Sequence, residues 1–359
     1  MSNVTWTITP VDTWFFRQGI PFEAGDHVSS QDILFPPHMT TLQGAIRTAI
    51  ARQQGWVPGH DALWPAALGT PDDLGAVSLE GPFLRKGNTI LYPVPRCLLR
   101  TQTGQLVRLR PGPPVESDLG IRSLPVLARP RGKEEKVSEL EGAYITLEGL
   151  TLCLQGEMPP WDSLVQAEEL WQAEPRIGLT LNAPSKTAQN GLLYRAAHIR
   201  LLDDVALIVT VTGLPVDWQD AVTLMPLGGE NRFARVRIDS GSVPMPHPEI
   251  VSGPDGVYRV FALLLTPGLF ADPQHVLTHG PFPVPCVSAV TDRIAMRGGW
   301  DLRRHIPRDL RPFVPAGSVW FYQLTPDQWH DLQPPNGTVH EGMDTEYGFG
   351  HMIFGQWEE

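Results

Sequence analysis

The apolar residues of this chain fall into short blocks, and this division limits the folds that it can adopt. The longest apolar runs are "VALIVTV", residues 205–211, and "VFALLL", residues 260–265. Runs of this length suit buried strands and are too short to span a bilayer. Between them lie 34 glycines and 36 prolines, about a fifth of the chain, which favour short elements joined by long loops.

Local patterns predict the individual elements. Residues 5–16 alternate β-branched and aromatic side chains, as a strand does. A helix should begin at Thr40, with Gln43 completing a capping box, and end at Gly55. A hairpin is expected around Gly87 and Asn88. Further elements are predicted as a helix at 161–174, strands at 205–212, 258–265 and 318–324, and a terminal "HMIFGQW" segment. The order indicates an α+β fold built on split βαββαβ units.

Charge and cysteine content exclude several classes of protein. The net charge of -11 argues against a protein that coats nucleic acid non-specifically, yet residues 96–136 hold nine basic and four acidic side chains. Residues 106–139 also show little periodicity, which predicts an exposed insertion. Three dispersed cysteines indicate neither a disulfide framework nor a zinc site, and the first ten residues lack signal-peptide character, so a cytoplasmic protein without a membrane anchor is expected. Nucleotide-binding, H-E-x-x-H and G-x-S-x-G motifs are absent.

Three glycine-centred segments stand out. They are "PLGGENRFARVR" (226–237), "RGGWDLRRH" (297–305) and "YGFGH" (347–351). Glycines let backbone N–H groups approach phosphates, arginines bind phosphate oxygens in a bidentate fork, and aromatic rings stack on bases. Each segment is also consistent with a simple tight turn, so it is their occurrence together in one chain that favours a nucleic-acid contact.

Six motifs in order resemble a known family. They are "PVDTWFFRQGIPF", "FPPHMTTLQGAIRTA", "RIGLTLNAPSKTAQNGLLYRAAHIR", "LGGENRFARV", "RGGWD…AGSVWFYQL" and "YGFGHMIFG", which together span about residues 9–355. The chain resembles the RAMP-superfamily proteins that form the third-named subunit of the Cmr effector complex in type III-B CRISPR systems. It departs from their pattern at Gln18, at 188–190 and at 196–197, where acidic residues are frequent in the family.

The resemblance implies two ferredoxin-like (RRM-type, βαββαβ) domains with long loop insertions. We expect an N-terminal domain at 1–170 with a basic insertion at about 96–140, and a C-terminal domain at 171–359 with a glycine-rich loop at 347–351. Such subunits hold the repeat-derived 5′ handle of the CRISPR RNA (crRNA) in antiviral defence and contact the large polymerase-like and backbone Cmr subunits, and indirectly target RNA. The insertion at 106–139 is a candidate for a thumb-like element across the guide, or equally for a disordered or partner-binding loop.

The same resemblance and the glycine segments define the expected site. No catalytic residue, metal or cofactor is predicted. The alternative is a metal-independent endoribonuclease that processes repeat RNA, with His38 as general base. A third possibility is an adaptor that binds only protein. The expected RNA-binding residues are Arg17, His38, Arg47, Lys186, Tyr194, Arg200, Gly228, Gly229, Arg232, Arg297, Gly298, Gly299, Trp300, Arg304, Gly348 and Gly350.

Arg17 follows Trp14, Phe15 and Phe16, which suit a core strand, although a guanidinium does not. One interpretation is that the aromatics anchor the strand and leave Arg17 facing RNA phosphate. The other is an internal ion pair with Asp12 or Asp32. The sequence leaves both open.

Overall fold

The computed structural model describes residues 3–16, 34–71, 73–117, 120–128, 136–181, 188–218, 222–301 and 306–358, with only the backbone described at 178–181 and 188–195. The chain divides into two compact units, each built from three segments. Unit 1 comprises residues 1–87, 168–243 and 296–311, and unit 2 comprises 88–167, 244–295 and 312–359. One crossing, at 167/168, lies close to the expected domain boundary at 170, but the two contiguous domains stay a prediction.

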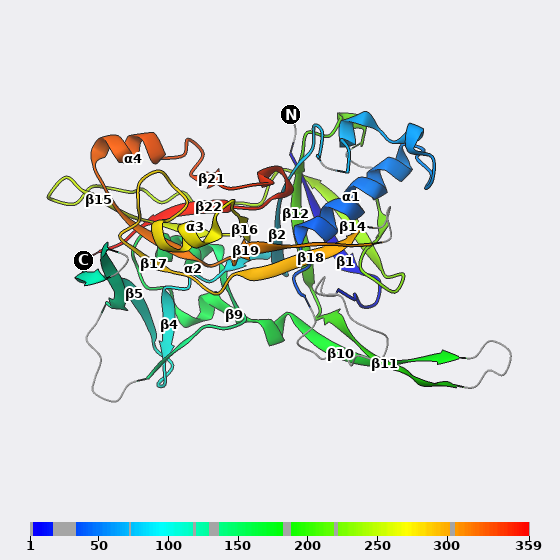
Figure 1. Cartoon of the computed structure of the whole chain (residues 1–359), viewed down its shortest axis with the longest axis horizontal. Helices are drawn as coiled ribbons and strands as arrows, with labels where there is room; N and C mark the ends of the chain where they lie inside the picture. Colours follow the sequence, from blue (N-terminus) through cyan, green and yellow to red (C-terminus); the bar gives the residue numbers. More distant parts are fainter. Residues whose placement is uncertain are drawn as a thin grey trace. The chain divides into compact units, whose positions relative to one another are not determined.

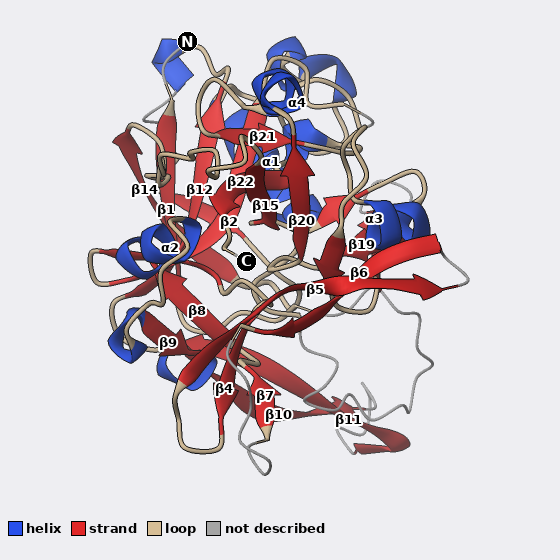
Figure 2. Ribbon diagram, turned by 90° about the vertical axis from the view of Figure 1, so that its left-hand side faces the viewer, coloured by secondary structure: helices blue, strands red, loops and turns tan. Residues whose placement is uncertain are grey.

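Unit 1 is organised around antiparallel strands in the spatial order β13-β14-β1-β12-β2 (Figure 2). Along the chain these elements occur in the order strand, helix, strand, strand, a 3₁₀ turn η6 (Val216–Trp218), and two further strands. The predicted strand at 205–212 is confirmed. The bounds are β1 Val4–Pro10, α1 Met39–Gln53, β2 Ser78–Lys86, β12 Val205–Thr212, β13 Leu224–Pro226 and β14 Phe233–Ser240.

Alternating side chains explain the core of unit 1. Trp6 and Ile8 of β1 are fully buried, and helix α1 buries Leu42 and Ile46. The predicted helix is therefore present, but its start differs. His38 is the N-cap, without a side-chain cap, because the Thr40 hydroxyl bonds to His38 Nδ1 and so does not cap the helix.

A long hairpin extends from the sheet of unit 1 (Figure 1). It consists of β10 (Trp171–Leu181) and β11 (Ala188–Leu201), paired from Trp171 opposite Leu201 to Leu181 opposite Ala188. Its base is joined to the segment after β1 by reciprocal backbone hydrogen bonds between Trp14 and Ile199, with N–O distances of 2.9 and 2.7 Å.

The predicted helix at 161–174 is wrong. The segment forms a 3₁₀ turn η4 (Trp161–Ser163), strand β9 (Leu164–Gln166), a 3₁₀ turn η5 (Ala167–Glu169) and the start of β10. Strand β9 pairs with β8 (Ala143–Thr146), and the beginning of β10 pairs with β11. Pairing with distant strands outweighs local helix propensity, which is a weak preference.

Unit 2 contains a five-stranded antiparallel sheet in the order β17-β20-β15-β22-β21. Its core includes Val260, Trp320 and Phe354, all nearly inaccessible to solvent. The predicted strands at 258–265 and 318–324 and the terminal segment are confirmed. The bounds are β15 Tyr258–Leu264, α3 Pro273–His279, β17 Ser288–Val290, β20 Val319–Leu324, α4 Pro326–Leu332, β21 Thr338–His340 and β22 His351–Gln356.

Other strands of unit 2 come from the first half of the chain. Gly87 and Asn88 form the predicted turn, after which strand β3 begins. Helix α2 follows β8 and is capped by Thr146, whose hydroxyl accepts from Gly149 N. The bounds are β3 Thr89–Pro93, β4 Leu98–Thr101, β5 Leu106–Ser117, β6 Gly120–Leu127, β7 Val137–Glu139, β8 Ala143–Thr146 and α2 Leu147–Leu154. Three strands from the second half, β16 Gly268–Leu269, β18 Ala295–Asp301 and β19 Ile306–Val314, form a separate sheet in the order β16-β19-β18.

The basic insertion at 106–139 is largely strand rather than irregular loop. Strands β6, β5, β4 and β7 form one sheet, and Ser123 N donates to the carbonyl of Val287 beside β17 at 3.1 Å. Most of its described side chains are nevertheless at least partly exposed, as predicted. A thumb-like role for this segment stays a prediction.

These elements confirm a mixed α+β, strand-rich fold. Among the described residues there are four α-helices, and none is long and apolar enough to cross a membrane.

Candidate nucleic-acid interface

The expected site residues are divided between the units. Gly348 and Gly350 belong to unit 2, and the remainder belong to unit 1. Arg17, Lys186 and Arg304 lie outside the described residues. Tyr194 lies on β11, opposite Gly178, where only the backbone is described.

The first glycine segment packs against the end of the first aromatic motif. Gly229 N donates to the carbonyl of Phe15 at 2.8 Å. Gly228 has a φ of 89°, and a Cβ there would lie 2.9 Å from that carbonyl oxygen. Only glycine combines this conformation with such a close approach. This geometry accounts for both glycines by contacts within the chain, and their predicted contact with RNA stays a prediction.

Beside this loop lies a cluster that we call the Asp12 network, composed of Asp12, Glu174, Arg176, Arg200 and Arg232. The Asp12 carboxylate accepts hydrogen bonds from Nη2 of Arg176 at 3.0 Å, Nη2 of Arg200 at 3.1 Å and Nη1 of Arg232 at 3.4 Å. Glu174 pairs with Arg176 and Arg200. The hydrogen bond from Arg176 is the largest cause of the lowered pKa of Asp12. The network therefore ties the hairpin base to residues on two other segments.

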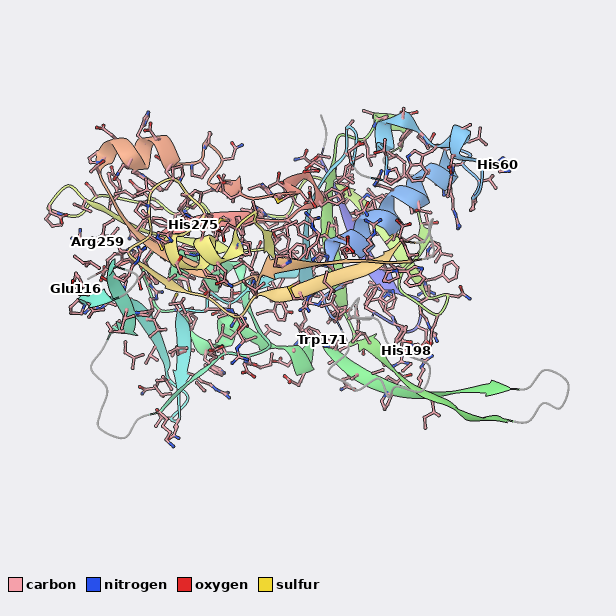
Figure 3. The ribbon with its side chains drawn as sticks, viewed as in Figure 1. His60, Glu116, Trp171, His198, Arg259 and His275 are labelled. Atoms are coloured by element: carbon pink, nitrogen blue, oxygen red, sulfur yellow. The ribbon has the colours of Figure 1, made fainter. Side chains whose placement is uncertain are left out.

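His198 continues this connection inward (Figure 3). Its fully buried ring bonds to Thr13 Oγ1 at 3.0 Å and to Glu230 Oε2 at 2.9 Å, and stacks on Phe15 with centroids 5.3 Å apart. Burial lowers its pKa, although Glu230 opposes the effect. His198 thus connects Thr13 to Glu230 as a neutral ring. The two arginines expected to bind RNA here, Arg200 and Arg232, are already ion-paired within the chain.

Residues 297–301 of the second glycine segment form part of strand β18, and 302–305 lie outside the described residues. Trp300 is 55% exposed. Among the described residues, the atom nearest to a Cβ at Gly299 would be Arg308 Cδ, at 3.8 Å. Gly298 and Gly299 lie between Arg297 and Trp300 on the same strand. The strand thus places two partly buried glycines between a basic and an aromatic side chain.

Arg297 brings positive charge to the start of α1. His38 is buried, and its pKa is lowered to about 3 by burial and by the charges of Arg297 and Arg311. Burial also lowers the pKa of Arg297. The first turn of α1 contains no acidic residue. Two guanidinium groups therefore lie near a neutral imidazole at this corner of unit 1.

Arg47 occupies a different environment. It is 5% exposed and donates to the carbonyls of Leu68, Thr70 and Asp73 and to the side chain of Gln43. Arg47 can be buried on α1 because the loop at 68–73 supplies enough acceptors for the guanidinium. In this conformation Arg47 stabilises the loop and presents no charge to a ligand.

Backbone atoms of the same chain pack tightly against the third glycine segment. Gly350 N donates to the carbonyl of Pro267 at 3.0 Å, and a Cβ on Gly350 would overlap the carbonyl oxygen of Glu341. Phe349 is fully buried. Gly348 has a φ of 88° and ends the 3₁₀ turn η7 (Thr345–Tyr347). Tight backbone packing accounts for both glycines, and their RNA contact stays a prediction.

The sequence matches a described family over almost its whole length. Residues 6–357 match the family model "CRISPR-associated protein (Cas_Cmr3)". The chain belongs to the Cmr3 family of CRISPR-associated proteins. The resemblance inferred from the six motifs is thereby confirmed. A comparison with curated proteins found no match.

Two solved structures share the fold of this Cmr3-family chain. A chain of the type III-B Cmr-β complex bound to cognate target RNA and AMPPnP gives a TM-score of 0.54 at 15% identity, covering 88% of this chain and 86% of that chain. A chain of the same complex bound to cognate target RNA gives 0.52 at 15% identity, covering 89% and 86%. At this identity the likeness shows the fold alone.

Three residues of the Cmr3-family chain were missed by the sequence reasoning. Arg176 and Glu174 lie on β10, two residues apart on the same face, and Arg311 lies on β19 near His38. The alternation of Glu174 and Arg176 was a detectable signal, but the incorrect helix prediction for 161–174 concealed it. Arg311 had no local signal. Among the described residues, no group of three His, Cys, Asp or Glu side chains is placed to hold a metal ion.

Proposed function

We propose that this Cmr3-family chain is a non-catalytic RNA-binding subunit of a type III-B CRISPR effector complex. It holds the repeat-derived 5′ handle of crRNA and docks the large polymerase-like subunit, next to the backbone subunits. The observation that carries the RNA contact is the exposed Trp300 on the same strand as Arg297, with two glycines between them.

This surface suits a single-stranded handle. An unpaired base can stack on Trp300, while Arg297 and Arg311 attract phosphates. The chain as a whole carries a net charge of -11, so the binding of RNA depends on local groups of basic side chains such as this one. The close fold of chains from complexes solved with target RNA supports the same assignment.

The arrangement of strands supports two ferredoxin-like (RRM-type) units. In unit 1, β1, α1, β2, β12 and β14 follow one another, and the sheet order is β14-β1-β12-β2. In unit 2, the succession β15, α3, β17, β20, α4, β22 has the corresponding order β22-β15-β20-β17. Both follow the split βαββαβ pattern, with η6 in place of the second helix in unit 1.

The environment of His38 supports the absence of catalysis. An effective general base has a pKa near the working pH, whereas burial and two arginines lower the pKa of His38 to about 3. The ring is 8% exposed and already bonds to Thr40. Incubation with repeat RNA, with and without EDTA, tests the alternative: we expect no specific cleavage, and cleavage that disappears in His38→Ala would establish the endonuclease.

The RNA-binding proposal is tested on the full chain by fluorescence anisotropy with two labelled RNAs of equal length, a handle-bearing RNA and a scrambled one. We expect the handle RNA to bind more tightly, and Trp300→Ala to weaken that binding about tenfold through the loss of one stacked base. Arg52→Ala is the matched control, because Arg52 is an exposed arginine on α1. Equal affinity for both RNAs, or no effect of Trp300→Ala, would refute the proposal.

Partners are tested separately by purifying the tagged chain from its native host. Sequencing of bound RNA should reveal short RNAs that share one repeat-derived 5′ end, and mass spectrometry should reveal a large polymerase-like protein. Recovery of proteins without RNA would favour the adaptor hypothesis instead.

A further inference from the structure

Strand β14 presents basic and aromatic side chains on one exposed face. Ala234 and Val236 point into the core, at 0% and 8% exposure, so Phe233, Arg235 and Arg237 alternate on the other face. All three are exposed. Neighbouring side chains do not cover them, since Arg235 lies opposite Thr9 of β1 and Arg237 lies opposite Thr7. The strand itself lies beside β1 near one edge of the sheet (Figure 2).

A third guanidinium joins this face from β2. Arg85 Nη1 lies 3.4 Å from Thr7 Oγ1, and Thr7 is the cross-strand neighbour of Arg237. Burial, and then the charge of Arg237, lower the pKa of Arg85, which shows that the two guanidinium groups are close. Arg85 Nε has no hydrogen-bond partner among the described residues. The group formed by Phe233, Arg235, Arg237 and Arg85 is called the β14 strip below.

The charges within the strip are only partly neutralised. Arg235 has no ion-pair partner in the part of the chain that the structure describes. Arg237 pairs with Asp239 at 3.0 Å, but both side chains are more than half exposed, and exposed pairs exchange readily for a stronger anion. Glu80 lies in the next row, across from Thr210, and burial raises its pKa. The strip thus contains three cations beside one exposed acid.

The spacing indicates the ligand. Alternate residues of a strand are about 6.7 Å apart, so Arg235 and Arg237 can each contact a phosphate along an extended chain. Phe233, 41% exposed, adds a ring on which any base can stack. Pro226 and Leu224 flank the strip as its cross-strand neighbours at the sheet edge. A single strand of nucleic acid suits this row, because its unpaired bases are free to stack on Phe233, whereas the bases of a duplex are already paired and stacked.

We propose that the β14 strip binds single-stranded RNA without sequence preference, with phosphates on Arg235, Arg237 and Arg85 and one base stacked on Phe233. This site is distinct from the surface of Trp300 and Arg297. The strip binds the same class of ligand as the proposed function, RNA, but its binding does not depend on recognition of the handle. A guide held at its end by one surface would thereby gain a second, general contact for the rest of its length.

The test uses the full chain and the scrambled single-stranded RNA in anisotropy titrations over a range of salt concentrations. Each phosphate contact on a single strand contributes about 0.7 to the slope of log affinity against log salt. Arg235→Ala combined with Arg237→Ala should therefore reduce that slope by about 1.4. Phe233→Ala should weaken binding about tenfold with little change in slope. Both variants should affect scrambled and handle RNA equally.

Arg52→Ala again serves as the control, and unchanged thermal unfolding verifies that each variant is folded. Unaltered affinity and slope in the double variant would overturn the proposal. So would losses confined to handle RNA, or no binding of scrambled RNA even at low salt. If the chain shows no preference for handle RNA but the double variant still reduces the salt slope, the proposed function fails while the proposal for the β14 strip stands. The two failures are therefore distinguishable.

Discussion

His340 and His351 stack across the paired strands β21 and β22, with ring centroids 4.3 Å apart and ring planes 14° apart. His351 is 1% exposed, and its pKa is lowered to about 3 by burial and by the charge of His340. His351 directly follows the closed Gly348–Gly350 segment. A proton on His351 would place a charge in the core of unit 2, so the pair is stable only when neutral.

Acidification should therefore destabilise the protein. The unfolded chain binds a proton at His351 near pH 6.5, whereas the folded chain does not until about pH 3. Stability is then highest above pH 6.5 and falls as the pH decreases toward 3, by about 2 kcal/mol between pH 7.5 and 5.0 for this group. Urea unfolding at these two pH values measures the difference. His351→Phe should reduce the difference in unfolding free energy between the two pH values by about 2 kcal/mol, whereas His330→Ala, at an exposed position, should leave that difference unchanged. An equal loss in all three proteins would contradict the assignment.

The Asp12 network should hold the base of the β10–β11 hairpin. In Asp12→Asn, Arg176, Arg200 and Arg232 lose a shared carboxylate, and amides at the hairpin base should exchange hydrogen about threefold faster, as expected for an exposed ion-pair cluster. Hydrogen exchange with mass spectrometry measures this. Asp255→Asn, which removes the exposed partner of Arg259 in unit 2, is the control. Faster exchange at the hairpin base in the control as well would show that the network has no specific role.

Arg47 should be a stability residue. Arg47→Met keeps the apolar stem but leaves the carbonyls of Leu68, Thr70 and Asp73 without this donor inside the protein. Buried acceptors that lose their donor cost about 1–3 kcal/mol each, so we expect a loss of about 3 kcal/mol or more in urea unfolding. Arg52→Ala, on the exposed side of the same helix, should change stability little. A stable Arg47→Met protein with weakened RNA affinity would restore the original binding prediction.

Gly350 should tolerate no side chain. Gly350→Ala combines a φ of 68° with overlap of the Glu341 carbonyl, which predicts a loss of about 3 kcal/mol. Gly256→Ala isolates the conformational part, because its φ is 76° but no atom lies within 4 Å of the added Cβ; about 1 kcal/mol is expected. Thermal and urea unfolding compare the two variants. Equal losses would show that backbone conformation, not the contact with Glu341, decides the requirement for glycine.

The sequence identified the features that depend on neighbouring residues. Strands at 205–212, 258–265 and 318–324 are confirmed because their continuous apolar runs bury both faces of a sheet. Family membership also followed from the sequence, since six ordered motifs are specific even where each alone is not. The helix at 161–174 failed because β8 and β11, which lie outside that segment, pair with it.

Tertiary structure alone decided the environments of the polar residues. Arg47 and Arg297 are both arginines near helix α1, yet one is enclosed by the carbonyls at 68–73 and the other lies close to His38 on a strand from the far end of the chain. A local pattern specifies which side chains can carry charge. Whether that charge is satisfied internally or left for RNA depends on which distant segments pack against it, and that information exists only in the folded chain.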